Sequence, residues 1–161
     1  MTAPTLSPLT TPAPHPRPAT TWADLITAVQ DTGQYPTRAE AERITRIVLS
    51  ALGGHVTGDE RVALAQALPE EAARLVAAHI PVTRPLTAPE FVDRTAARIE
   101  GATPATARWD VSSVLCALPP LLGDALVDDI LRQLPPGYAL LFGRAELGAG
   151  ARPGSAGPAG E

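Results

Sequence analysis

Lysine and asparagine are absent from this sequence of 161 residues, and all 13 basic residues are arginine. The missing lysine excludes a Schiff-base or P-loop site. The missing asparagine excludes N-linked glycosylation and a cysteine–histidine–asparagine protease site. Both residues have AT-rich codons, so their absence favours a GC-rich bacterial genome. The single cysteine, Cys116, cannot form an internal disulfide, and the fold must therefore be stabilised by packing alone.

Aromatic residues and long apolar runs are also scarce. Aromatics make up only 4% of the chain, so we expect a core of Ala, Leu, Val and Ile. No apolar run approaches the roughly 20 residues of a membrane-spanning helix. The N-terminus lacks the apolar segment of a signal peptide. We therefore expect a soluble cytoplasmic protein that does not bind membranes.

An excess of positive charge is missing as well. The sequence has 13 basic and 17 acidic residues, which gives a formal net charge of −4. The arginines are dispersed, and the few aromatic residues are not interleaved with them. Proteins that bind nucleic acid instead gather basic residues on one surface. We expect no nucleic-acid partner.

Proline and glycine, in contrast, are abundant and concentrate at the two ends of the chain. Residues 1–19 carry prolines at six even-numbered positions, and residues 145–161 are rich in Gly, Ala and Pro. Such segments have little to bury, which favours disorder. We predict a Pro-rich arm over 1–19, a folded domain over 20–144 and a disordered tail over 145–161.

The segment 20–144 has the helix start and stop signals of an all-α protein. Thr21 with Asp24, and Thr37 with Glu40, have capping-box spacing, and apolar residues follow each pair at helical intervals. Strand signals are nearly absent. Four helices are predicted in the first half: from Thr21 to Gly33, from Thr37 to Gly53, from Gly58 to Pro69, and from Pro69 through Ala78.

The pattern then begins again. A shift of 66 residues aligns Thr21–Val76 with Thr87–Phe142 without a gap. Identities cluster at core and punctuation positions, as in Leu68-Pro69 and Leu134-Pro135. We predict an internal duplication with repeat 1 at about 21–80 and repeat 2 at about 87–144, and a bundle of two tandem four-helix repeats.

Two segments carry a resemblance to a known family. These are VLSALGGHVTGDERVALAQALPEE, which begins at Val48, and VLCALPPLLGDALVDDILRQLPPGY, which begins at Val114. Each has a valine-leucine helix, a Gly-Asp turn and a helix that ends in Leu-Pro. The chain resembles the bacterial family called domain of unknown function 2267. Where that family often carries an Arg-Leu pair, this sequence has Gly54-His55 and Pro120-Leu121. The resemblance implies an all-helical fold and no assigned activity.

The histidines and the cysteine are the first residues to test for chemistry. His15, His55 and His79 lie on no common helix face and have no other metal ligand at a suitable spacing. His55 aligns with Leu121, which indicates a structural histidine at the surface or half-buried. His79 ends the fourth helix, where a cation is favourable. Cys116 aligns with Ser50 and is interpreted as a small packing residue.

The charged residues suggest no active site either. Asp128 and Asp129 are adjacent and diverge around a helix, so they cannot act as a pair. Arg43 and Arg46 are offset by Glu40 and Glu42, which is typical of a solvated face. No motif of a hydrolase, nucleotide-binding protein or metalloprotease occurs. We therefore predict no catalytic, cofactor-binding or metal-binding residue, and no cofactor.

The large side chains near helix ends leave two interpretations open. Most of the aromatics are expected to pack in the core as anchors that join helices, but some could instead be exposed and bind a partner. These residues are Trp22, Tyr35, Trp109, Tyr138 and Phe142.

Three functional hypotheses follow. The first is a non-enzymatic helical module for protein interaction or scaffolding, including self-association. The second is a small-ligand binder or enzyme, with a site in the cleft between the repeats where His55 and Arg43 would meet acidic residues of the other half. The third is an adaptor tethered through residues 1–19.

Overall fold

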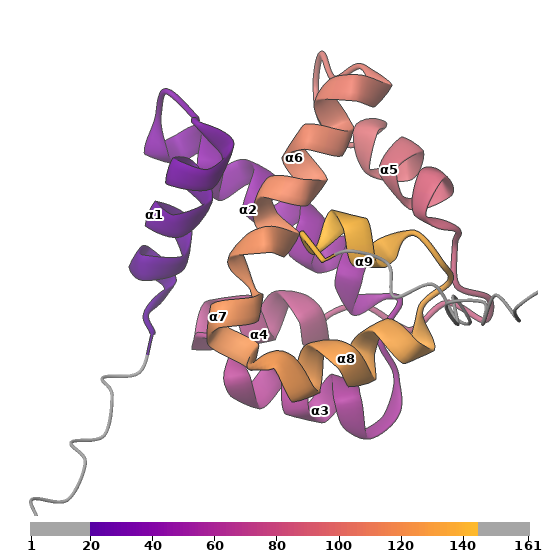
Figure 1. Cartoon of the computed structure of the whole chain (residues 1–161). Coiled ribbons are helices and arrows are strands. Elements are labelled where there is room, and N and C mark those ends of the chain that lie inside the picture. The colour runs from indigo at the N-terminus through magenta and orange to yellow at the C-terminus, as the bar shows by residue number, and fades with distance from the viewer. Residues whose placement is uncertain (1–19, 145–161) are drawn as a thin grey trace, which may run out of the picture.

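The computed structural model describes residues 20–144, and in that part every regular element is a helix (Figure 1). The all-α prediction is thus confirmed. The arms expected at 1–19 and 145–161, with His15 and the adaptor hypothesis, lie outside the described residues. The helices are α1 (Trp22–Gly33), α2 (Arg38–Gly53), α3 (Gly58–Ala67), α4 (Glu70–Ala77), α5 (Ala88–Ala96), α6 (Pro104–Ala117), α7 (Pro119–Leu122), α8 (Asp124–Gln133) and α9 (Tyr138–Leu141).

Threonine caps begin four of the longer helices. The hydroxyls of Thr21, Thr87 and Thr103 each accept a hydrogen bond from the backbone N–H three residues later. The side chain of that later residue in turn accepts a hydrogen bond from the backbone N–H of the threonine. At Thr37 the hydroxyl accepts from the Glu40 N–H at 3.2 Å, without a bond back from the Glu40 side chain. The cap predicted at Thr37 is present, but of the two hydrogen bonds of a capping box only the one to the Thr37 hydroxyl is formed. These bonds satisfy amide groups that a helix start leaves unpaired.

The second half has one more helix than the four expected. Leu118 alone separates Pro119 and Pro120 from the end of α6 at Ala117. The two prolines cannot donate backbone hydrogen bonds, so α6 does not continue and the single turn of α7 follows. In the first half, the Gly53-Gly54 pair ends α2 without such a turn. The described residues therefore contain the eight expected helices and the short α7.

The two halves are interleaved. Helix α1 packs against α2 of its own half and α6 of the other, while α5 packs against α6 of its own half and α2 of the other. Helices α3 and α8 also meet across the halves, at the bottom of Figure 1. Each half therefore covers apolar surface of the other.

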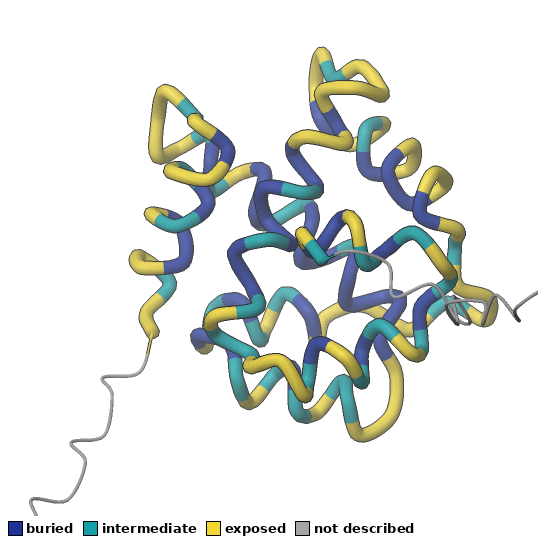
Figure 2. Tube along the Cα trace, viewed as in Figure 1, coloured by how far each residue is buried: buried dark blue, intermediate teal, exposed yellow. Residues whose placement is uncertain are grey.

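The buried side chains form one cluster through both halves (Figure 2). Leu68 and Leu134, which close α3 and α8, are each only 7% exposed. Of the aromatic residues, Tyr138 and Phe142 are buried as expected, and Trp22 and Tyr35 are half-buried. Trp109 differs, because 56% of it is exposed. Its Nε1 still donates to the Gly33 carbonyl at 3.0 Å and so joins α6 to α1.

Two polar side chains fix the loops between helices. The Arg61 guanidinium donates to the carbonyls of Gly53 and Val76, at the C-terminal ends of α2 and α4. Gln133 forms a two-way amide pair with Thr57, donating to its carbonyl and accepting from its N–H, both at 3.0 Å. Gln133, which precedes Leu134-Pro135, thus connects α8 to the α2–α3 loop of the other half.

Candidate functional site

A small pocket lies where the end of α2 meets α5 and the segment between α4 and α5. Its volume is about 140 Å³. The segment is held in place because the Val82 N–H donates to the Gly54 carbonyl at 2.8 Å. Residues of both halves thus line this pocket.

His55 forms one wall of the pocket. Its ring is 7% exposed and stands edge-on to Phe91, with the ring centroids 5.1 Å apart. Nδ1 lies 2.8 Å from the Ala51 carbonyl oxygen. Because a carbonyl only accepts, Nδ1 must carry a hydrogen, and this fixes Nε2 as the atom left for another partner. The structure corrects the expectation of a surface or half-buried histidine, because Phe91 and the segment around Val82 cover the ring.

Nε2 of His55 is buried and has no hydrogen-bond partner in the part of the chain that the structure describes, and the same holds for Oγ1 of Thr95. Thr95 lies on α5 and is 1% exposed. Both residues line the pocket. A buried polar atom without a partner is unfavourable by about 1–3 kcal/mol, and native structures contain few. Two residues that carry such buried atoms therefore line one small pocket of the described part of the chain.

A third unpartnered buried atom lies elsewhere. Nε1 of Trp22 faces the contact between α1 and α2, where the Arg46 guanidinium is stacked 5.0 Å from the indole ring. Arg46 also pairs with Glu42, and this hydrogen bond holds the pKa of the Glu42 carboxyl below its usual range. Trp22 lines none of the pockets described here and belongs to this charged contact between helices.

The remaining lining divides into an apolar wall and a polar rim. The apolar side chains are Ala51, Ile80, Val82, Leu86 and Phe91. The polar ones, besides His55 and Thr95, are Ser50, His79, Arg94 and Arg98. Within residues 20–144, no Asp or Glu lines the pocket. It therefore combines an apolar wall, two unsatisfied buried groups and exposed cationic side chains.

Arg43 does not reach this pocket. It lines a separate groove of about 470 Å³ with Tyr35, Trp109 and Asp110, between α1, α2 and α6. The polar atoms of that groove are largely satisfied, since the Tyr35 hydroxyl donates to Asp110 at 2.6 Å. Burial raises the pKa of Asp110, and the hydrogen bond from Tyr35 partly opposes this rise. The expectation that His55 and Arg43 share one cleft is therefore wrong.

His79 also differs from its expected role. Its side chain is exposed at the pocket rim, while its carbonyl accepts from Arg61. Arg61 supplies the cation at the end of α4, by donating to the carbonyls of Val76, Ala77 and His79. The sequence analysis missed Arg61, because it lies outside α4 and reaches that helix end only in the folded chain.

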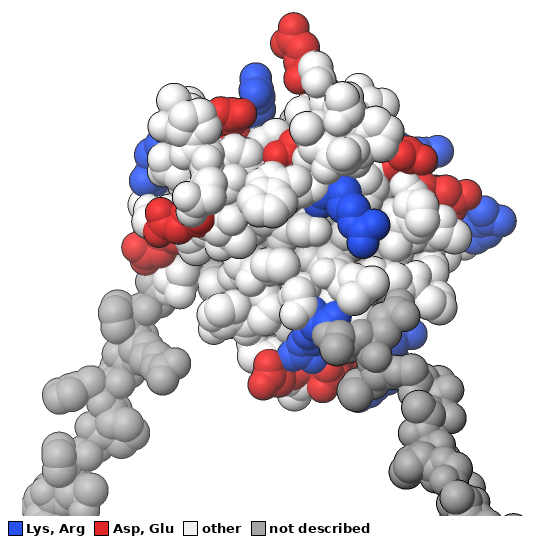
Figure 3. All heavy atoms as spheres, turned by 45° about the horizontal axis from the view of Figure 1, so that its top comes forward, with Lys and Arg blue, Asp and Glu red and all other residues white. Residues whose placement is uncertain are grey.

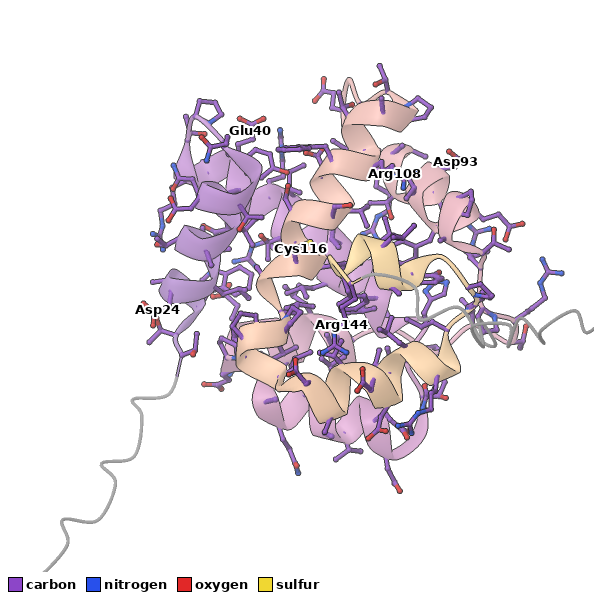
Figure 4. The ribbon with its side chains drawn as sticks, in the orientation of Figure 1. Asp24, Glu40, Asp93, Arg108, Cys116 and Arg144 are labelled. Atoms are coloured by element: carbon purple, nitrogen blue, oxygen red, sulfur yellow. The ribbon has the colours of Figure 1, made fainter. Side chains whose placement is uncertain are left out.

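The other candidate residues lie apart from the pocket. Cys116 lies on α6 behind α9 (Figure 4), where its Sγ contacts the Leu141 carbonyl at 3.5 Å and burial raises the pKa of the thiol. Asp128 pairs with Arg144, and Asp129 pairs with Arg132. These two adjacent carboxylates therefore face different cations, as their divergence on the helix predicts.

The charged surface shows no single-sign region in the view of Figure 3, where basic and acidic side chains are interspersed. No group of three or more potential metal ligands occurs among residues 20–144. Within the same residues, no helix is both long and apolar enough to span a membrane.

Thr95 was not singled out from the sequence, although a signal for it existed. The 66-residue shift aligns Thr95 with Val29, which is fully buried in α1. It also aligns His55 with Leu121. Polar residues also align with apolar ones elsewhere, as Asp110 does with Ile44, but the structure brings Thr95 and His55 to the same pocket.

Comparison with known families gives one match. The model of a family described as "Uncharacterized conserved protein (DUF2267)" matches residues 22–141. A search of curated proteins finds no match to this chain.

Proposed function

Since the chain belongs to the DUF2267 family, whose description assigns no activity, we propose from the pocket itself that it is a non-enzymatic module that binds a small ligand where its two halves meet. The proposal selects the binding part of the second functional hypothesis. It places the ligand against His55 and Thr95.

The observation that carries the proposal is the pair of buried, unpartnered atoms at one pocket, Nε2 of His55 and Oγ1 of Thr95. A ligand that bonds to both would remove the unfavourable free energy of leaving them unsatisfied. Apolar walls with a few convergent polar groups are typical of small-molecule sites. Ordinary ligand pockets have about 300–1,000 Å³, so a pocket of about 140 Å³ favours a ligand of only a few heavy atoms.

The pocket is poorly equipped for catalysis. Its one hydroxyl besides that of Thr95 belongs to Ser50, and no hydrogen bond joins Ser50 to His55 among the described residues. Nδ1 of His55 bonds to a main-chain carbonyl, whereas a catalytic triad directs that atom at a carboxylate. These features support binding without turnover.

The hypothesis of a protein-interaction or scaffold module, including self-association, stays a prediction, and so does the absence of nucleic-acid and membrane partners. A bacterial source and a cytoplasmic location are likewise proposed from composition. The exposed Trp109 beside the Arg43 groove is a surface on which partner binding can be tested.

The experiment that tests ligand binding compares two threonine variants. Thr95→Val removes the unpartnered hydroxyl. Thr45→Val makes the same change at a buried threonine of α2 whose hydroxyl donates to the Ala41 carbonyl at 2.7 Å. A library of small polar compounds is screened by thermal shift on the wild type and both variants. Ligand at about 100 times its Kd adds roughly 2.7 kcal/mol to the free energy of unfolding.

We expect compounds that raise the Tm of the wild type and of Thr45→Val but leave Thr95→Val unchanged. If no compound shifts the wild type, or if Thr95→Val responds equally, the pocket is not a ligand site.

A further inference from the structure

We infer that the ligand of this pocket is a small oxyanion, a carboxylate or a phosphate. The inference rests on the proposed function and adds the chemical class of the ligand. It is carried by the arginines around the pocket and by two buried, unpartnered atoms of residues that line it.

Two arginines, Arg94 and Arg98, line the pocket, and among the described residues no carboxylate does. Neither arginine forms an ion pair within the described part of the chain, although Glu90, one turn before Arg94, is near enough for the two charges to attract. Arginines without an ion-pair partner raise the local concentration of anions and hold oxyanions through charge-assisted hydrogen bonds.

Several arginines elsewhere in the domain form ion pairs, although Arg38, Arg43 and Arg108 form none within the described residues. Arg46 pairs with Glu42 and Glu71, Arg74 pairs with Glu70, and Arg144 pairs with two aspartates of α8. These pairs join residues within one helix or across neighbouring elements. On α5, by contrast, Glu90 is engaged at the helix start, where its carboxylate accepts from the Thr87 N–H at 2.8 Å. Arg94 on α5 and Arg98 just after it line the pocket.

The buried atoms fit an oxyanion. The Thr95 hydroxyl can donate to a ligand oxygen. Because Nδ1 of His55 is committed to the Ala51 carbonyl, Nε2 needs one proton between itself and a ligand oxygen. That proton comes either from the ring as imidazolium or from a hydroxyl of the ligand, as in a phosphate monoanion. In both arrangements each of the two buried atoms gains a hydrogen-bond partner.

The size of the pocket limits the rest of the ligand. About 140 Å³ accommodates inorganic phosphate or a short carboxylic acid, and Val82, Leu86 and Phe91 offer an apolar wall to a short hydrocarbon chain. Water is the competing occupant, because a polar pocket of this size holds several molecules. The experiment must therefore separate an anion from water and from neutral ligands.

The fold itself does not require these polar residues. Under the 66-residue shift, Arg94 and Arg98 align with Ala28 and Thr32, in addition to the alignment of Thr95 with Val29. Helix α1 carries these counterparts and packs against α6 without presenting a cation from them. The cationic and hydrogen-bonding groups are thus gathered at the contact between α2 and α5, and not at the contact between α1 and α6.

The test uses the full chain and isothermal titration calorimetry at constant ionic strength in chloride. The probes are inorganic phosphate, acetate and butyrate, with acetamide and butyramide as neutral counterparts of the two carboxylates. We expect at least one anion to bind with 1:1 stoichiometry and the amides not to bind. Phosphate without the carboxylates, or the reverse, identifies which oxyanion the pocket prefers.

Three variants locate the binding. Arg94→Gln and Arg98→Gln should each weaken anion binding roughly tenfold or more, since each removes a charge-assisted bond. Arg108→Gln is the matched control, because Arg108 is exposed on α6 and lines a different groove (Figure 4). Thr95→Ser keeps the hydroxyl and should retain binding that Thr95→Val loses, which guards against an effect of folding.

The outcomes separate the two proposals. If the amides bind as tightly as the carboxylates and Thr95→Val abolishes both, the site takes ligands but not anions in particular, and only the oxyanion inference fails. If Arg108→Gln weakens anion binding as strongly as Arg94→Gln does, the anions bind diffusely over the surface and the inference is overturned. If neither the probes nor the screened compounds bind, the pocket holds only water and both proposals fail.

Discussion

The two places where a first helix packs across the halves differ in chemistry. Helix α5 meets α2 around His55 and Thr95, and leaves a pocket with unsatisfied polar atoms. Helix α1 meets α6 with Val29 fully buried, and hydrogen bonds close its edge. These bonds run from Tyr35 to Asp110 and from Trp109 to Gly33.

The difference shows what each contact contributes. The α1–α6 contact combines apolar burial with satisfied polar groups at its edge, which is the arrangement that stabilises a fold. The α2–α5 contact stabilises the fold less, because the unpartnered polar residues Thr95 and His55 stand where the other half has Val29 and Leu121. Residues that lower stability without evident structural need are typical of functional sites. Both contacts nevertheless join the halves.

The largest expected effect comes from removing both contacts together. Residues 20–82 expressed alone lack the α5 and α6 surfaces that cover α2 and α1. A unit of about 60 residues is marginal even when its own core is complete. We expect no cooperative thermal transition for this fragment by circular dichroism, while residues 20–144 melt cooperatively. A fragment that melts near the Tm of residues 20–144 would show that each half is an independent domain.

Next in size are the leucines that close the third helix of each half. Leu68 and Leu134 are equally buried, so Leu68→Ala and Leu134→Ala should each lower the free energy of unfolding by about 2–5 kcal/mol. Urea denaturation of the two variants measures this directly. A large effect in one half only would show that the Leu-Pro ending has a packing role in that half alone. Pro135→Ala is the milder control, because alanine can adopt the same backbone angles.

Exchanging one residue between the two contacts tests their comparison most directly. Val29→Thr places a hydroxyl in the apolar contact and should lower the free energy of unfolding by about 1–3 kcal/mol. Thr95→Val removes the unpartnered hydroxyl and should raise it by about 1 kcal/mol. Chemical denaturation without added ligand gives both values. If Thr95→Val is destabilising, the hydroxyl already has a stabilising partner, and the contrast between the contacts is smaller than proposed.

A smaller effect is expected at the edge of the α1–α6 contact. Tyr35→Phe removes the hydrogen bond to Asp110, which should lower stability by about 1–2 kcal/mol at about pH 7. Burial already raises the pKa of Asp110, and losing this bond raises it further. Stability from a raised carboxyl pKa is present below the unfolded-state pKa and is lost as pH rises.

The destabilisation by Tyr35→Phe should therefore be smaller at about pH 3 than at about pH 7. Thermal melts of the wild type and the variant at both pH values measure the difference. A pH-independent difference would mean that Asp110 stays equally protonated with and without the Tyr35 hydroxyl.

The sequence predicts a feature well when the residues that determine it are close together in the chain, and poorly when they are far apart. Caps such as Thr21 and breaks such as Pro69 act within a few residues, so the helices could be read from the chain almost completely. The site depends on contacts between distant residues. His55 and Thr95 lie 40 positions apart and meet only when α5 packs on the end of α2. Likewise, Trp109 gives no local sign that it stays exposed.

The smallest effect is expected at Cys116, which aligns with Ser50 of the other half. Cys116→Ser keeps a small side chain that can donate to the Leu141 carbonyl, as the thiol does at 3.5 Å, so the free energy of unfolding should change by no more than about 1 kcal/mol. Burial raises the pKa of the thiol, and only the thiolate reacts with alkylating reagents. Iodoacetamide should thus modify Cys116 more slowly in the native chain than in urea, which mass spectrometry can follow. Equal rates would show that α9 opens from α6 freely, and that the contact around Cys116 is much weaker than those that join the halves.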